Sequence, residues 1–206
     1  GGGGAGGAGG GGDGGGAGGG CAGRDPRTGA DYLYLETLGG GFGGRATHDG
    51  TDGVQVHITN TSNLPVEAIE MEYPLRVESY GFVADSGGAG RHRGGLGLRR
   101  VITPVAHDCV FNGAGERFRN APWGVFGGGP GARGSFVHEP TDAEPVQLDN
   151  KPNAVRVLAG ERVIVQTPGA GGYGSAAERD EQAVAADELS GKFSAQFLQE
   201  HYGKSS

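Results

Sequence analysis

The sequence predicts a mainly β fold, an antiparallel sandwich or barrel-like structure, closed by a small helical hairpin at the C-terminus (α+β). Short strand-like runs follow one another from Asp31 onward, separated by Gly, Pro and Asn/Asp clusters and without intervening helices. Glycine also makes up 47 of the 206 residues, about three times its average share of about 7%. Such a chain forms turns and close backbone contacts more readily than long helices.

The strand-like runs are short and rich in β-branched or aromatic residues. One stretch, residues 65–71, is ambiguous, because VEAIEM favours a turn of helix as much as a strand. The predicted strands are residues 32–35, 54–58, 68–73, 77–83, 98–102, 110–112, 155–158 and 162–166.

The pattern changes at Ala176, where AAERDEQAVAADELSGKFSAQFLQEHY predicts two short helices broken near Ser190 and Gly191. Their apolar side chains are available to pack on the β-structure. These are Val184, Leu189, Phe193, Phe197 and Leu198.

The chain divides by composition into a glycine-rich leader (1–23), a β-rich domain (24–175) and a helical extension (176–206). The leader holds 17 of the 47 glycines, so it has almost no side chains to bury and is predicted to be disordered. A flexible linker and a misread or truncated gene start explain it equally well.

The formal net charge of −7 argues against nucleic acid or an anionic membrane as the main partner. No stretch of 18 apolar residues and no secretory signal is recognisable in the sequence, which predicts a cytoplasmic location. Only Cys21 and Cys109 are present, so a disulfide framework is not expected, and Cys109 is predicted to be a small core residue.

Several glycine-rich motifs follow one another in a fixed order along the chain. They are GGGFGGR, DGTDGVQVHITNT, NLPVEAIEMEYPLR, DSGGAGRHRGGLG, APWGVFGGGPGARG and LAGERVIVQTPGAGGYG. Together they resemble the carboxy-terminal part of the B subunit of the hydantoinase and 5-oxoprolinase family, which also contains subunits of acetone and acetophenone carboxylases. The resemblance covers roughly residues 24 to 203, and it implies a fragment, the last third of a longer subunit.

The resemblance implies ATP-driven opening of a cyclic amide such as 5-oxoproline or a hydantoin, together with an A-type subunit that handles ATP. ATP and a divalent metal are implied for the complete enzyme, but not as ligands of this piece. Two alternatives stay open: a non-catalytic scaffold or interface domain, and a subunit of an ATP-dependent ketone carboxylase of the same family. The isolated chain is expected to be inactive.

The polar groups of the stretch 39–100 are the candidate substrate contacts, because they alternate with apolar runs and need partners near a core. No catalytic residue is assigned. The candidates for substrate binding are His57, Asn60, Glu67, Arg76, Arg91 and Arg93.

Each candidate has a plainer explanation. His48, Asp49, Asp52 and His57 could bind a divalent cation, but Asp-Gly dipeptides are common in turns. The acids at 67–72 beside Arg76 suit acid/base catalysis, although a structural ion-pair network is favoured. The arginines at 91 and 93 suit a phosphate or carboxylate, but also a solvated basic loop.

Two further motifs are not assigned to a ligand site. The G-x-G-x-x-G patterns beginning at Gly39 and Gly169 lack the βαβ context of a dinucleotide site. Trp123, between turn residues in PWGVFGG, is predicted to be a buried apolar anchor.

Overall fold

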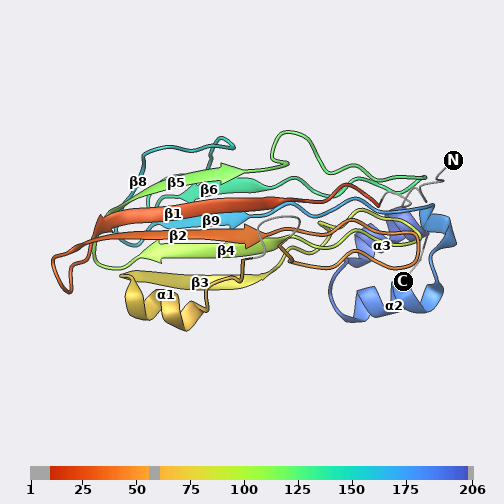
Figure 1. Ribbon diagram of the computed structural model, residues 1–206, viewed down its shortest axis with the longest axis horizontal. Helices are drawn as coiled ribbons and strands as arrows, with labels where there is room; N and C mark the ends of the chain where they lie inside the picture. The colour runs from red at the N-terminus through yellow and green to blue at the C-terminus, as the bar shows by residue number, and fades with distance from the viewer. Residues whose placement is uncertain (1–9, 56–60, 204–206) are drawn as a thin grey trace, which may run out of the picture.

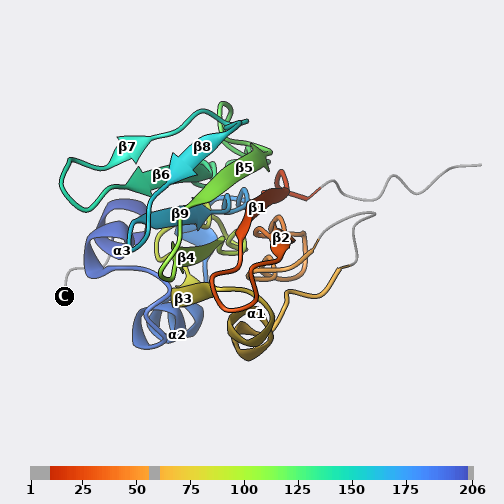
Figure 2. The same cartoon turned by 90° about the vertical axis from the view of Figure 1, so that its left-hand side faces the viewer.

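A computed structural model describes residues 10–55 and 61–203. Its strands form two separate sheets, one of four strands and one of five, and every neighbouring pair of strands is antiparallel. Neither sheet closes on itself, so the predicted mainly β fold is confirmed as a sandwich rather than a barrel. Figure 2 shows the two sheets nearly end-on.

In neither sheet do the strands lie in the order in which they occur along the chain, so segments far apart in the sequence become neighbours. The four-stranded sheet has the order β2 (Asp31–Gly39), β1 (Gly16–Arg24), β5 (Cys109–Gly115) and β8 (Val155–Val157). The five-stranded sheet has the order β3 (Leu75–Phe82), β4 (Leu98–Pro104), β9 (Arg162–Gln166), β6 (Ser135–Glu139) and β7 (Val146–Gln147).

The main core lies between the facing sides of the two sheets. Phe111 of β5 and Phe136 of β6 meet edge to face with ring centroids 5.6 Å apart, and both side chains are buried. Cys109 is a free, buried thiol in this core, as predicted. Ile102 of β4 and Val163 of β9 complete the contact between the sheets.

The predicted disordered leader is wrong for residues 16–23, which belong to β1. This strand pairs with β2 on one side and with β5 on the other, so its backbone groups are satisfied on both edges. Its inward side chains, Ala17 and Cys21, are almost fully buried. At Gly19 a side chain would crowd the ring of Phe111, because an added Cβ would lie 3.1 Å from that ring. Strand β1 is therefore stabilised by its own backbone hydrogen bonds and by the side chains of neighbouring strands that pack against its glycines.

The helices lie outside the sandwich. The ambiguous stretch forms α1 (Val66–Glu72), so the predicted strand at 68–73 is wrong, and the buried Ile69 attaches this helix to the core. The C-terminal hairpin is confirmed as α2 (Glu181–Leu189) and α3 (Ala195–Tyr202), preceded by the 3₁₀ turn η1 (Ala176–Glu178).

Helices α2 and α3 begin at side-chain caps and share a second, smaller core. The carboxylate of Asp180 accepts a hydrogen bond from Ala183 N at 3.0 Å, and the hydroxyl of Ser194 accepts one from Phe197 N at 3.2 Å. Leu189, predicted to pack, is instead 92% exposed. The residues that do pack are Val184, Phe193, Leu198 and, in part, Phe197.

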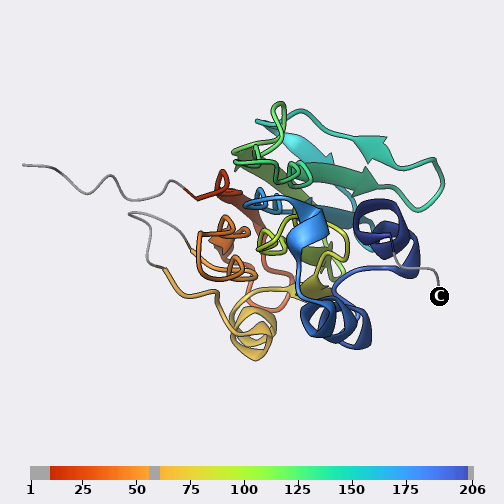
Figure 3. The same cartoon turned by 90° about the vertical axis from the view of Figure 1, so that its right-hand side faces the viewer.

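Between the sandwich and the helical hairpin lies a region of extended chain that is neither sheet nor helix. Figure 1 shows these segments running side by side from the strand ends toward α2 and α3, and Figure 3 shows the same end of the molecule face-on. We call it the glycine layer, and it comprises residues 10–15, 40–44, 86–97, 122–131 and 168–174.

Backbone hydrogen bonds join the segments of the glycine layer directly. Gly44 N donates to Gly171 O at 2.9 Å, Ala170 N to Gly95 O at 2.9 Å, and Gly172 N to Gly129 O at 2.9 Å. The chains approach so closely that side chains are excluded. A Cβ added to Gly94 would lie 1.8 Å from Ala170 O. Glycine at such positions is a steric requirement, as it is at the crowded axis of collagen.

Within the described ranges, no helix is long and apolar enough to cross a membrane.

Replacing Gly94 by alanine tests the packing of the glycine layer. The new methyl group would collide with the carbonyl oxygen of Ala170, and because both partners are backbone the collision cannot be relieved by a change of rotamer. We expect the free energy of unfolding to fall by about 3 kcal/mol or more. Urea unfolding of the Gly94→Ala chain measures the loss.

Gly81→Ala is the matched control, because Gly81 lies on the exposed strand β3 and an added Cβ there meets no atom within 4 Å. Its unfolding free energy should stay within about 0.5 kcal/mol of the original chain. Equal stability of the two variants would show that the layer tolerates side chains.

Candidate functional site

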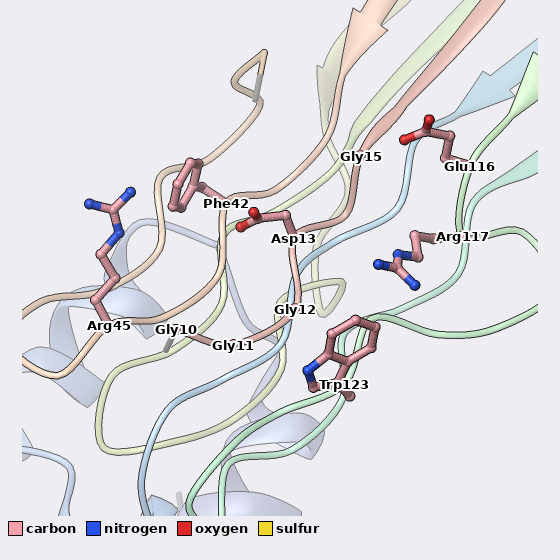
Figure 4. Close-up of a pocket in the computed structure, with 10 residues that line it drawn as sticks. All are labelled: Gly10, Gly11, Gly12, Asp13, Gly15, Phe42, Arg45, Glu116, Arg117 and Trp123. Carbon is pink, nitrogen blue, oxygen red and sulfur yellow. The ribbon is translucent and has the colours of Figure 1, made fainter. Parts of the chain in front are cut away.

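A cavity of about 590 Å³ opens where the start of the described chain crosses the edge of the glycine layer. Figure 4 shows its lining. The volume lies within the range of about 300–1,000 Å³ that small-molecule sites usually have. Its walls and floor come from three segments of the chain: Gly10, Gly11, Gly12, Asp13 and Gly15; Phe42 and Arg45; and Glu116, Arg117 and Trp123.

The floor of the cavity is glycine backbone. Gly12 N donates to Trp123 O at 2.7 Å, and Gly11 N donates to Gly44 O at 2.8 Å, so this strip is hydrogen-bonded into the glycine layer. A Cβ on Gly12 would lie 3.0 Å from the indole ring of Trp123. These positions therefore fit so closely against their neighbours that the floor of the cavity is built from backbone alone.

Two arginines lie over two aromatic rings at the sides of the cavity. The guanidinium carbon of Arg45 is 4.1 Å from the ring centroid of Phe42, and that of Arg117 is 4.5 Å from the ring centroid of Trp123. Both distances are within the range of cation–π interactions. The predicted burial of Trp123 is wrong, because 53% of its surface is exposed at the cavity. Its indole is a wall of the cavity.

Arg117 holds its position at an energetic cost. Its backbone has φ of 55°, in the left-handed region that residues other than Gly, Asn and Asp seldom adopt. Such a residue costs on the order of 1–3 kcal/mol, and strained residues of this kind gather at ligand sites. The conformation carries its guanidinium over the indole, toward the floor of the cavity (Figure 4).

Carboxylates of Asp13 and Glu116 also line the cavity. One oxygen of Asp13 accepts a hydrogen bond from Gly43 N at 2.8 Å, which fixes the carboxylate at the rim. The side chain of Glu116 lies against Gly15, a position where a Cβ would collide with it. The cavity thus offers guanidinium donors and carboxylate acceptors, which suits a ligand that carries both an acidic group and an N–H donor.

The residues predicted from the sequence to bind substrate lie elsewhere or outside the described ranges. His57 and Asn60 fall in the segment 56–60, which is not described. Glu67 is exposed on α1, and Arg91 is exposed on a loop, 3.9 Å from Glu178. Arg76 is exposed on β3. None of the described candidates lines the cavity, and their assignment as substrate contacts stays a prediction.

The acids of α1 do not form the expected network with Arg76. The nearest carboxylate oxygen to the Arg76 guanidinium is that of Glu78, at 3.9 Å, among the described ion pairs. Glu70 instead accepts a hydrogen bond from Val77 N at 3.0 Å, where the helix meets β3. Glu70 and Arg76 share the lining of a second cavity of about 280 Å³.

Arg93 is part of a buried ion-pair network that fastens α2 to the glycine layer. Its guanidinium donates to Asp52 at 2.7 Å and to Asp187 at 3.1 Å. Arg179 donates to the other oxygen of Asp187 at 2.7 Å and to Asp49 at 2.7 Å. Both arginine side chains are at most 5% exposed. Paired groups of this kind stabilise a helix contact, and breaking one pair leaves a buried charge unpaired.

The network also sets the acidity of its carboxyl groups. Burial alone raises the pKa of Asp52, but the hydrogen bond and charge of Arg93 outweigh it, and the pKa lies below its ordinary value. The pKa of Asp49 is lowered in the same way, with burial opposing the hydrogen bond and charge of Arg179. Both groups are therefore more acidic in the folded chain than in the unfolded chain.

The metal site considered at His48, Asp49, Asp52 and His57 is not formed by the described members of that set, because the two aspartates bind arginines instead. No group of three or more His, Cys, Asp or Glu residues that could hold a metal ion occurs within residues 10–55 and 61–203.

The sequence matches a known protein family over most of its length. Residues 5–176 match the sequence model of a family described as Hydantoinase B/oxoprolinase, and the match begins inside the glycine-rich start. The chain is 42% identical over 142 residues to 5-oxoprolinase 1 of Arabidopsis thaliana, covering 69% of this chain and 11% of that protein. It is 35% identical over 161 residues to a protein of Pseudomonas sp. strain NS671 named as the B-type subunit of a D-/L-hydantoinase, covering 78% of this chain and 27% of that protein.

The fold is shared with a solved structure. The ATP-dependent caprolactamase from Pseudomonas jessenii superposes with a TM-score of 0.75 and 25% sequence identity, over 89% of this chain and 33% of that chain. The chain therefore spans a third or less of these three proteins.

Acid should weaken the ion-pair network. Because the pKa of Asp52 is lowered on folding, the unfolded chain binds more protons than the folded chain once the pH falls toward the ordinary aspartate value of about 3.9. Stability conferred by Asp52 is fully present above that value and is lost as the pH falls through the pKa of the folded chain. Urea midpoints measured between pH 7 and pH 3 follow the loss.

Asp52→Asn separates this contribution from general acid unfolding. At pH 7 we expect the variant to lose about 1–3 kcal/mol, because Arg93 keeps only part of its buried partners. Between pH 5 and pH 3 its stability should fall less steeply than that of the original chain. An unchanged slope would show that Asp52 does not contribute to the acid response.

Proposed function

Since the chain belongs to the Hydantoinase B/oxoprolinase family, we propose that it is part of a B-type subunit of an ATP-dependent cyclic amide hydrolase that opens 5-oxoproline or a hydantoin. The observation that carries the proposal is the family match over residues 5–176. Relatives named as a 5-oxoprolinase and a hydantoinase subunit, both at least 35% identical, support the reaction class.

The proposal concerns a larger assembly. The chain spans 27% of the hydantoinase subunit and 33% of the caprolactamase chain. We propose that it corresponds to the carboxy-terminal third of such a subunit, that it acts in the cytoplasm, and that it works with an A-type subunit that handles ATP. Its own contribution is then one wall of the substrate site, together with a scaffold for the rest.

The chemistry requires an unreactive amide to become an electrophile. A phosphoryl group transferred from ATP to the amide oxygen would make the carbonyl carbon a better electrophile. Water would add at that carbon, the ring C–N bond would break as the nitrogen takes up a proton, and hydrolysis of the resulting acyl phosphate would release phosphate and leave the carboxylate. The residues of this chain would bind and orient the amide. Arg117, held over the indole of Trp123, can bind an acidic substituent, and Glu116 can accept the amide N–H.

The enzyme assay uses the complete subunit that contains this sequence, co-purified with its ATP-handling partner. Turnover of 5-oxoproline or hydantoin should form the ring-opened product and ADP in equal amounts, and omission of ATP should abolish it. Ring opening without ATP, or ATP hydrolysis unaffected by any cyclic amide, would contradict the proposed reaction.

We predict that the 206-residue chain alone neither hydrolyses ATP nor opens 5-oxoproline, because it supplies only part of the proposed site. Release of phosphate and formation of glutamate by the purified chain are the two measurements. Phosphate release that survives repurification and disappears in a cavity variant such as Arg117→Gln would show that the chain is itself a catalyst.

A further inference from the structure

The two arginines of the cavity have unused hydrogen-bond donors. Each guanidinium lies on an aromatic face, 4.1 Å from the ring of Phe42 for Arg45 and 4.5 Å from the ring of Trp123 for Arg117. Within the described residues, neither guanidinium donates a hydrogen bond or forms an ion pair. Other arginines at the same end of the molecule, Arg93 and Arg179, each form ion pairs with two carboxylates. Among the described residues, the cavity arginines therefore differ from these two in having no carboxylate partner.

Arg117 is the better placed of the two to hold a ligand. Its side chain is partly buried, whereas that of Arg45 is exposed, so a ligand at Arg117 competes less with water. Its left-handed backbone, with φ of 55°, directs the guanidinium over the indole instead of into solvent. A planar guanidinium binds a carboxylate through two parallel hydrogen bonds. The flat indole beneath the guanidinium of Arg117 helps to fix the orientation of this group.

The neighbouring residue gives the cavity an acceptor beside that donor. Glu116 precedes Arg117 and lies against Gly15, on the same side of the cavity in Figure 4. No ion pair joins Glu116 to a basic group within the described ranges. A site for a simple anion would gain nothing from a carboxylate at this position, since like charges repel. A ligand that carries a carboxylate and an amide N–H uses both groups.

We propose that this cavity binds a cyclic amide that bears a carboxylate, with the carboxylate on Arg117 and the amide N–H on Glu116. Within the proposed function, on which this inference rests, the site selects an acidic cyclic amide such as 5-oxoproline over a neutral lactam. The indole of Trp123 lies beneath the guanidinium of Arg117 and lines the same cavity, and the glycine floor carries no side chains. Arg117 is then the residue that determines specificity.

Trp123 is the only tryptophan of the chain, so its fluorescence reports directly on the cavity. The full 206-residue chain is titrated with 5-oxoproline, with calorimetry as a second measurement of binding. Two probes separate the ligand's groups: 2-pyrrolidinone has the ring amide without the carboxylate, and cyclopentanecarboxylate has the carboxylate without the amide. We expect saturable binding of 5-oxoproline and at least tenfold weaker binding of both probes.

Arg117→Gln should weaken 5-oxoproline binding at least tenfold. Glutamine keeps a Cβ, so the strained backbone is unchanged while the charged fork is lost. Arg119→Gln is the matched control, because Arg119 is 73% exposed, lies outside the cavity and contacts Asp149 instead. Its affinity should equal that of the original chain. Should Arg117→Gln unfold, Arg117→Lys keeps the charge without the fork and should also weaken binding.

Several outcomes would overturn the proposal. They are equal binding of 2-pyrrolidinone, equal binding of inorganic phosphate, undiminished binding by a folded Arg117 variant, and no binding of 5-oxoproline. The titration needs neither ATP nor a partner protein, so its result is independent of the enzyme assay. Binding without turnover in the complete assembly would refute the proposed function alone. Turnover with an unchanged KM in Arg117→Gln would refute only this site.

Discussion

Contact of backbone with backbone in the glycine layer is the constraint on which the rest of the structure depends. Five chain segments from distant parts of the sequence lie so close that an added Cβ would fall within 2.0 Å of a neighbouring carbonyl oxygen at Gly41, Gly43 and Gly94. Segments at this distance can satisfy one another's peptide groups without forming a regular sheet. The layer therefore joins the sandwich on one side to the helical hairpin on the other.

A layer made mostly of glycine offers few apolar side chains to a helix. Leu96 packs against Val184, Phe193 and Leu198, and long charged side chains supply the rest of the contact. Arg93, from the layer, and Arg179, ahead of α2, both reach Asp187 on the helix, while Asp49 and Asp52 anchor the arginines to the layer. The geometry explains why these charges are buried and paired. Acids and arginines in a glycine-rich stretch suggested a ligand site from the sequence, whereas their partners in the structure are one another.

The sequence predicted the parts of the fold that side chains determine. Strands β4 and β9 and the two C-terminal helices carry clear apolar patterns, and all four form close to where they were expected. Strand β1 escaped prediction because its stability comes from neighbouring backbones and from the ring of Phe111, which no local pattern of a glycine run reveals. The short strands β6 and β7 also depend on pairing, β6 with β9 and β7 with β6.

The cavity was missed for a related reason. Its residues come from three segments and share no motif, and Trp123 had the pattern of a buried anchor. A signal was nevertheless present, since a lone tryptophan beside glycines, preceded closely by an acid and an arginine, has the side chains of a ligand site. The sequence alone could not predict the glycine floor of the cavity. Gly11 and Gly12 fit closely against neighbouring backbone and the indole of Trp123. The volume of the cavity lies next to them. The packing that excludes side chains from the layer thus also creates, at its edge, the space that a ligand can occupy.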